Sequence, residues 1–152
     1  VLWRKRRDGH RATAGSLRAA LGRFSGRRGR ARVAALIPLG TDRADSPPES
    51  AIRLRFLRAD LPRMLVNVGI TSAEGFLIAQ PDLQFPDYRM AYDYEGDHHR
   101  TDPGQWRKDL ARVPRLQDAG WHHTRVSAAD LADSTELLHR TRRLLRERGW
   151  TG

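Results

Sequence analysis

The chain has 152 residues, of which 39% are hydrophobic and 30% are charged, so it is long enough to build the core of one ordinary domain. It contains no cysteine, which excludes disulfides and thiolate metal sites. No apolar run approaches the roughly 20 residues of a transmembrane helix, and no signal-peptide pattern is present, so we expect no membrane partner and a cytoplasmic location. Because the first residue is Val1 rather than Met, we expect a piece of a longer protein.

The net charge of +10 is concentrated at the N-terminal end. Residues 1–32 hold eleven of the 28 Lys/Arg and one of the 18 Asp/Glu, so the rest of the chain is neutral. Such a basic cluster attracts phosphates and favours nucleic acid as a partner. The alternative is a solvated, arginine-rich segment between domains. The DNA-binding residues predicted in this arm are Arg4, Lys5, Arg6, Arg7, Arg27, Arg28 and Arg30.

The N-terminal part has weak helix signals. Residues 1–15 lack apolar periodicity and are typical of a linker, whereas apolar residues at helical spacing predict a helix over 16–24 with Ser16 as its N-cap. A second short helix is predicted over 30–37, ended by Pro38, and a loop over 40–46. Residues 1–45 are therefore predicted to form a basic arm with short helices.

Residues 46–95 predict one helix and three strands. Ser46-Pro47-Pro48-Glu49 combines a capping serine, prolines in the first turn and a glutamate three residues after the serine, which is typical of a helix start. Strands are predicted over 65–70, 76–85 and 89–95, with a tight connection at 85–88. Consecutive strands with short loops predict an antiparallel meander.

The C-terminal part alternates helix and strand. A helix is predicted over 102–119 with Pro114 inside it, then a strand over 121–126. A last helix is predicted to be capped by Ser127 or Asp133. Strands that flank a helix can pair in parallel through a crossover. Residues 46–152 are therefore predicted to be an α/β domain, with a mixed sheet of about four strands and helices on its faces. The buried helix face is predicted to comprise Leu137, Leu138, Thr141, Leu144 and Leu145.

Three acids carry the strongest chemical signal. Asp93 and Glu95 are two apart on one predicted strand, so they point to one face, and the turn near 86–88 returns them towards Asp82. Carboxylates this close repel each other unless a cation neutralises them, and hard oxygen ligands suit Mg²⁺ or Mn²⁺. Relief of this repulsion predicts that removing one acid leaves the metal-free fold intact or slightly more stable. The alternative is an exposed strand face of solvated acids.

Five ordered motifs point to a known family. They are S-P-x-E-S-x-x-R at residues 46–53, P-D-L-x-F-P at 81–86, an acidic pair followed by Gly96, His99 and Arg100, Q-W-x-x-D-x-x-R at 105–112, and A-G-W at 119–121. From about Ser46 to Gly149 the chain resembles the domain-of-unknown-function family related to very-short-patch repair endonucleases, within the PD-(D/E)xK superfamily.

The resemblance implies a restriction-endonuclease-like fold and a metal-dependent DNA endonuclease that uses Mg²⁺ or Mn²⁺. Asp82 would be the central metal ligand, with Asp93 and Glu95 as the second acidic pair. His99 would orient or activate water or protonate the leaving group. The resemblance also implies an upstream winged-helix module in the full-length protein. Its supporting and DNA-contacting residues would be Glu49, Arg100, Lys108, Asp109 and Arg112.

The chain departs from the family pattern at two points. Asp93 and Glu95 stand where the family usually has Glu and then Asp, so the side-chain lengths are exchanged, and Glu95 fills the position of the superfamily's lysine. These departures favour a second function, a catalytically weak or inactive nucleic-acid-binding module of a defence or toxin–antitoxin system. His122 and His123 alternate faces of a predicted strand, so at most one can join the site, and both are predicted to have ordinary surface or core roles.

Overall fold

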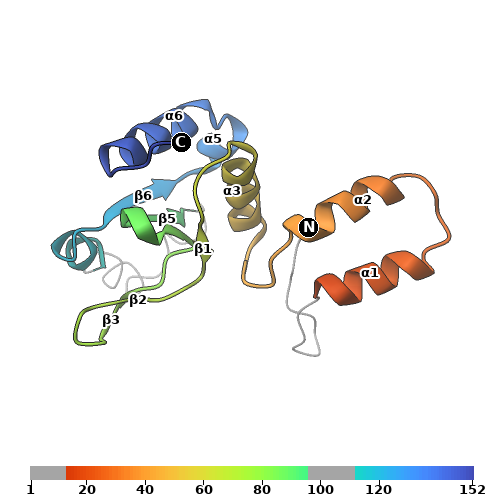
Figure 1. Cartoon of the computed structure of the whole chain (residues 1–152), viewed down its shortest axis with the longest axis horizontal. Coiled ribbons are helices and arrows are strands. Elements are labelled where there is room, and N and C mark those ends of the chain that lie inside the picture. Colours follow the sequence, from red (N-terminus) through yellow and green to blue (C-terminus); the bar gives the residue numbers. More distant parts are fainter. Residues whose placement is uncertain (1–12, 96–111) are drawn as a thin grey trace. The chain divides into compact units, whose positions relative to one another are not determined.

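The computed structural model of the chain describes residues 13–95 and 112–152. The chain divides into two compact units, residues 1–50 and 51–152. Helix α3 (Pro47–Arg58) begins in the first unit and continues in the second (Figure 1).

Two short helices are the main elements in the described part of the first unit before α3. Helix α1 (Ala14–Arg23) is capped by Thr13, whose hydroxyl accepts the Ser16 N–H while the Ser16 hydroxyl accepts the Thr13 N–H. The predicted cap at Ser16 is therefore wrong by three residues, because Ser16 is the third helical residue of a reciprocal capping box. Helix α2 (Arg30–Leu36) leads directly into the 3₁₀ turn η1 (Ile37–Leu39), which contains Pro38.

The predicted start of α3 is confirmed. The Ser46 hydroxyl accepts the Glu49 N–H at 3.3 Å. The Glu49 carboxylate accepts the N–H of Asp45 at 2.8 Å rather than that of Ser46, so the box closes one residue earlier than expected. Within the second unit, Ile52 and Phe56 of this helix are fully buried.

The second unit is built on a mixed four-stranded sheet in the order β1-β4-β5-β6, with helices beside it, as predicted for an α/β domain. Strand β1 (Leu65–Val66) pairs antiparallel with β4 (Leu83–Phe85), and β4 pairs antiparallel with β5 (Met90–Tyr94). Strand β6 (His122–Val126) runs parallel to β5, which confirms the parallel pair expected across a helix.

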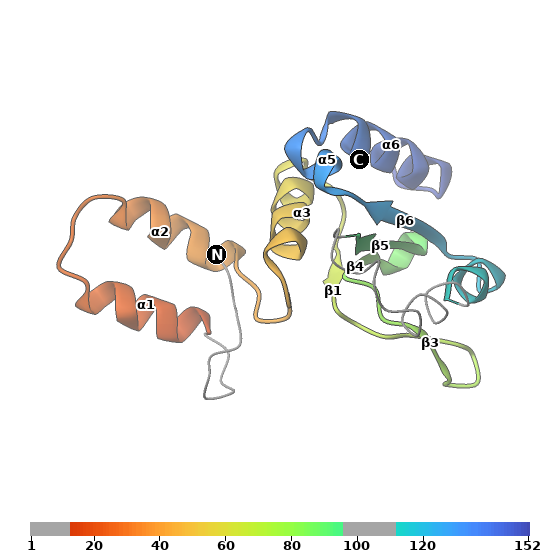
Figure 2. The same ribbon diagram turned by 180° about the vertical axis from the view of Figure 1, so that it is seen from behind.

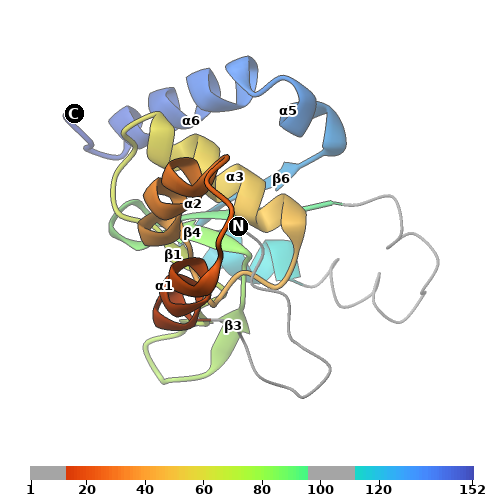
Figure 3. The ribbon, with the colours of Figure 1, turned by 90° about the vertical axis from the view of Figure 1, so that its right-hand side faces the viewer.

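The predicted three-strand meander is wrong in its details. Strands β2 (Ile70–Thr71) and β3 (Leu77–Ala79) form a separate two-stranded sheet, which projects on the side away from α6 (Figures 1 and 3). Each of the first two predicted strands divides, because Asn67 adopts a left-handed φ of 49° and Pro81 lacks the N–H of a strand residue. The 3₁₀ turn η2 (Pro86–Tyr88) then joins β4 to β5.

The two faces of β5 pack against different parts of the second unit. Tyr92 packs its ring against Phe56 and Phe85, and its hydroxyl donates to Thr141 Oγ1 at 3.0 Å. The other face carries Ala91, which packs with Leu116 and with residues of β2 and β3. Because side chains alternate along a strand, Asp93 shares the face of Ala91 and lies towards helical residues 112–118.

The predicted last helix is two helices. Helix α5 (Ala128–Ala132) is capped by Ser127 in a capping box with Asp130, and α6 (Thr135–Glu147) follows (Figure 2). Ser127 is thus a cap as predicted, whereas Asp133 ends α5, its Oδ1 accepts the Thr135 N–H, and Ser134 holds the N-cap position of α6. Among the described residues, no helix is long and apolar enough to cross a membrane. The α6 side chains that are fully buried are Leu137, Thr141 and Leu145.

Candidate acidic site

Asp82 and Asp93 meet across the β4–β5 pair. The register that places Leu83 opposite Tyr92 brings the next pair of positions, Asp82 and Asp93, together. The Asp82 N–H donates to Asp93 Oδ1 at 3.1 Å, and the Tyr94 N–H donates to Asp82 Oδ2 at 2.7 Å. The structure thus joins the two acids, as the strand spacing predicts, and each carboxylate is fixed by the main chain of the other strand.

Two further donors converge on Asp93. Arg112 Nη2 donates to Asp93 Oδ1 at 3.0 Å, and His123 Nε2 lies 2.6 Å from Asp93 Oδ2. The ionised carboxylate can only accept, so the Nε2–H of His123 is the donor. Side-chain exposure is 24% for Arg112, 18% for Asp93 and 7% for His123. The Asp93 carboxylate therefore lies largely out of solvent with a donor on each oxygen.

The surroundings of Asp93 lower its pKa below the usual value of an aspartate. Burial alone raises the pKa, but the hydrogen bond from His123, the charge of Arg112 and the N–H of Asp82 together outweigh burial. Asp93 is accordingly held in its ionised form by the folded protein.

Glu95, the third predicted acid, lies at the protein surface. Its side chain is 54% exposed and forms a 3.5 Å ion pair with Arg125, whose side chain is 49% exposed. For Glu95 this environment corresponds to the solvated alternative rather than to the closed cluster around Asp93.

Among the other predicted site residues, Glu49 and Arg112 lie in the described part of the chain. Glu49 belongs to the first unit, where it is buried at 6% exposure and accepts the Asp45 N–H. Arg112, predicted to contact DNA, lies instead in the acid cluster. The remaining predicted site and DNA-binding residues that lie outside the described part of the chain are Arg4, Lys5, Arg6, Arg7, His99, Arg100, Lys108 and Asp109.

The donor set only partly fits a metal ion. Carboxylate oxygens of Asp82 and Asp93 are the hard ligands that Mg²⁺ and Mn²⁺ prefer. However, both oxygens of Asp93 already accept hydrogen bonds. Within residues 13–95 and 112–152, no group of three or more His, Asp or Glu is arranged to hold a metal. The described residues therefore supply two ligands of suitable chemistry and not a complete site.

His123 is the site residue that sequence reasoning missed. The alternation of His122 and His123 allowed only one of them on the acidic face, and the parallel register decides that it is His123. His123 lies opposite Ala91, next to Asp93 along the same face. The sequence does show two histidines on the strand that follows the acidic strand. Which of the two faces Asp93 depends on how the two strands pair, and the sequence alone does not give that pairing.

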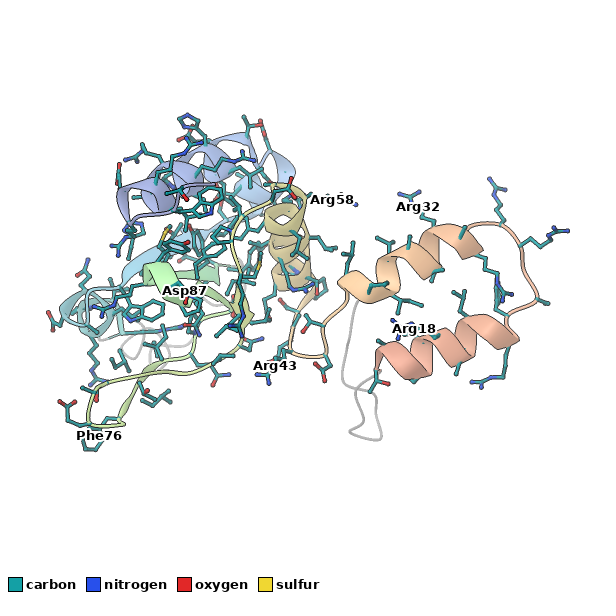
Figure 4. All side chains as sticks on the ribbon, viewed as in Figure 1. Arg18, Arg32, Arg43, Arg58, Phe76 and Asp87 are labelled. Atoms are coloured by element: carbon teal, nitrogen blue, oxygen red, sulfur yellow. The ribbon has the colours of Figure 1, made fainter. Side chains whose placement is uncertain are left out.

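Exposed arginines gather on the first unit. Arg18 and Arg32 lie on α1 and α2, as Figure 4 shows, and Arg27 and Arg28 lie in the connection between these helices. Arg30 is also exposed, and its Nη1 donates to the carbonyl of Phe24 at 2.9 Å. From residue 13 to residue 36 there is no acidic residue, so this helical pair is uniformly basic.

Comparison with known proteins gives two relatives of undefined function. Uncharacterized proteins from Mycobacterium tuberculosis strains CDC 1551 and H37Rv are each 30% identical to the chain over 111 residues. The match covers 73% of this chain, whereas the chain spans 41% of the length of these relatives. No family model matches the chain. The search of solved structures found no match.

Proposed function

We propose that the chain contains a metal-dependent endonuclease domain that hydrolyses phosphodiester bonds in DNA. The contact between Asp82 and Asp93 is the observation that carries this proposal. The Asp93 carboxylate accepts the Asp82 N–H and the Asp82 carboxylate accepts the Tyr94 N–H, so both carboxylates are fixed by main-chain N–H groups before any ligand arrives. Fixed charged groups need no reorganisation during a reaction, which is what electrostatic catalysis requires.

Asp82 and Asp93 would hold the divalent ion, Mg²⁺ or Mn²⁺. When bound, such an ion polarises a phosphodiester and lowers the pKa of a coordinated water. The protein's own part is to fix the two carboxylates by the β4–β5 main chain and to keep Asp93 ionised. Glu95, His99, Glu49 and Asp109 remain the further catalytic residues of this proposal, as the family resemblance implies.

Basic residues supply the proposed affinity for DNA. The arginines within residues 13–36, including Arg27, Arg28 and Arg30, are exposed, and this stretch contains no acidic residue. Such a surface gains affinity by releasing counterions from phosphates, and this gain does not depend on base sequence. The proposed domain would therefore bind DNA through the arm and cleave it near the acid pair.

A nicking assay tests the proposal. Supercoiled plasmid is incubated with the wild type in Mg²⁺, in Mn²⁺ and in EDTA, and with Asp82→Ala in the same ions. We expect nicking that requires the ion and is lost in Asp82→Ala, because one missing carboxylate leaves a divalent ion short of oxygen ligands. Asp87→Asn is the matched control, because Asp87 is an exposed acid in the η2 connection between the same two strands (Figure 4).

One observation favours a second function, a nucleic-acid-binding module without catalysis. Arg112 and His123 already satisfy both oxygens of Asp93, so no cation is needed to offset that carboxylate. If the chain is such a binding module, the wild type should bind DNA in a salt-dependent way and should leave the plasmid intact in both Mg²⁺ and Mn²⁺. Nicking by the wild type that Asp82→Ala abolishes would rule it out.

A further inference from the structure

The acidic face of β5 joins three separate elements at one carboxylate. Asp93 lies on β5, His123 on the parallel strand β6, and Arg112 at the beginning of the described part of the helical segment 112–118. The register places Arg125 directly opposite Asp93, yet the 2.6 Å contact is made diagonally by His123. Asp93 is therefore the point at which this helical segment and both parallel strands meet.

Each donor reaches a different part of Asp93. His123 Nε2 contacts Oδ2, whereas Arg112 Nη2 and the Asp82 N–H both contact Oδ1. A carboxylate with donors on both oxygens cannot rotate without breaking a hydrogen bond, and at 18% exposure it has little water to replace the loss. His123 is the donor to Oδ2. The orientation of the Asp93 carboxylate therefore depends on His123.

We propose that His123 is a positioning residue for Asp93, with Arg112 as its partner on the other oxygen. His123 holds the carboxylate in the orientation that faces Asp82 and does not itself contact the reacting atoms. For its kinetic effect this role rests on the proposed endonuclease function. Groups that orient the side chains of a metal site typically change affinity or activity about 10- to 100-fold when removed.

The neighbouring histidine offers a natural control. His122 pairs with Met90, so it shares the face of Tyr92 and points away from Asp93. It has the same side chain, one residue away on the same strand. A change at His122 disturbs β6 to a comparable extent while leaving the Asp93 carboxylate and its donors in place.

The kinetic experiment compares His123→Leu, His123→Gln and His122→Leu in the full chain, with a DNA duplex and Mn²⁺. We expect His123→Leu to lower kcat about 10- to 100-fold with the KM for DNA within about twofold of wild type. His123→Gln should recover most of kcat, because its amide nitrogen can stand where Nε2 stands. His122→Leu should match wild type. Equal kcat for wild type and His123→Leu, or no recovery with His123→Gln, would overturn the proposal.

A second measurement works without metal or cleavage. The imidazole ¹⁵N spectrum of the metal-free protein should show the His123 proton fixed on Nε2 in the wild type and lose that signature in Asp93→Ala, while the His122 signals stay unchanged. Asp93→Thr, whose β-branched side chain suits a strand and is too short to reach His123, replaces Asp93→Ala if the latter does not fold.

The kinetic and NMR measurements distinguish failure of the endonuclease proposal from failure of the positioning role of His123. If the wild type does not cleave but the His123 signature depends on Asp93, the endonuclease proposal fails and the positioning of Asp93 by His123 stands. If the His123 signals are the same with and without the Asp93 carboxylate, the positioning role is wrong whether or not the protein cleaves DNA.

Discussion

At the scale of single residues, the contacts of Asp93 reverse the effect on stability that is expected from removing this acid. Repulsion among three bare carboxylates predicts that removing one of them is harmless or stabilising. In the structure, Asp93 is instead the shared acceptor of Arg112 and His123, both of them largely buried. The dominant electrostatic interaction at this position is therefore attraction, and removal of the carboxylate takes the acceptor away from Arg112, His123 and the Asp82 N–H.

We expect Asp93→Ala to lower the free energy of unfolding by about 3 kcal/mol, as breaking a largely buried ion pair does. Glu95→Ala should change it by less than about 0.5 kcal/mol, because a 3.5 Å pair at the surface contributes little. Urea unfolding of the metal-free proteins measures both. An Asp93→Ala protein as stable as the wild type would show that the cluster is not a structural element.

The lowered pKa of Asp93 predicts the pH dependence of this contribution. A carboxyl group whose pKa is lower in the folded than in the unfolded state stabilises the fold above its unfolded pKa, about 3.9 for an aspartate, and loses that contribution as pH falls through the folded value. The stability difference between wild type and Asp93→Ala should therefore be largest near neutral pH and shrink on acidification below about pH 4. Urea midpoints at several pH values would show a constant difference if Asp93 did not titrate in this way.

At the scale of elements, one buried polar pair links α6 to β5. The Tyr92 hydroxyl and Thr141 Oγ1 bond at 3.0 Å inside the core, and both residues are 1% exposed. Burial raises the pKa of Tyr92 to about 12, so the hydroxyl stays a donor at neutral pH. This hydrogen bond thus links α6 to the sheet inside the core, beside the buried Leu137 and Leu145 of the same helix.

Tyr92→Phe should destabilise the protein by about 1–3 kcal/mol, because Thr141 loses its partner in the core. The double variant Tyr92→Phe with Thr141→Val should recover part of that loss, since both polar groups are then removed. Thermal or urea unfolding of the two single variants and the double variant gives the coupling. Strictly additive losses would mean that the hydrogen bond does not link the two elements.

Helix α5 depends on its cap. Ser127 Oγ accepts the Asp130 N–H and donates to the Asp130 carboxylate, so a five-residue helix is held by a reciprocal box. Ser127→Ala should cost about 1 kcal/mol of stability. Ser134→Ala, at the start of α6, should cost less, because Ser134 makes no N-cap bond there and loses only the hydrogen bond that its hydroxyl donates back to the Asp130 carbonyl at 2.8 Å. Equal losses in urea unfolding would contradict this assignment of caps.

At the scale of the whole molecule, charge is divided unequally along the chain. Residues 1–32 account for the entire net charge of +10, and the remainder is neutral. Affinity for DNA that comes from neutralised phosphates falls with salt in proportion to the number of phosphates contacted. The salt dependence of binding therefore reports which part of the chain meets the DNA.

We expect the triple variant Arg27→Gln, Arg28→Gln and Arg32→Gln to weaken DNA binding. The slope of log affinity against log salt should become shallower by up to about 0.9 for each lost phosphate contact. The control replaces Arg58, Arg63 and Arg115 by Gln, which removes the same charge from exposed positions of the second unit. Fluorescence anisotropy at several salt concentrations measures both variants. If the two slopes change equally, only net charge matters and the basic arm has no special role.

The sequence by itself determined the elements whose cause is local. Ser46 and Glu49 start α3 through a cap, Ser127 starts a helix, and the spacing of Asp82 and Asp93 around a tight connection brings the two acids together. Capping and strand alternation involve residues only a few positions apart, so their signals lie in short stretches of sequence.

Only the tertiary structure decided what surrounds the acids. The parallel register of β5 and β6 selects His123 over His122, and Arg112 meets Asp93 from nineteen positions further along the chain. The strands predicted over 65–70 and 76–85 divide at Asn67 and Pro81, and β2 and β3 pair with each other in a sheet of their own. A one-residue change of register would exchange the faces of every side chain on β6, and no local pattern in the sequence specifies that register, which is set by packing against both faces of the sheet.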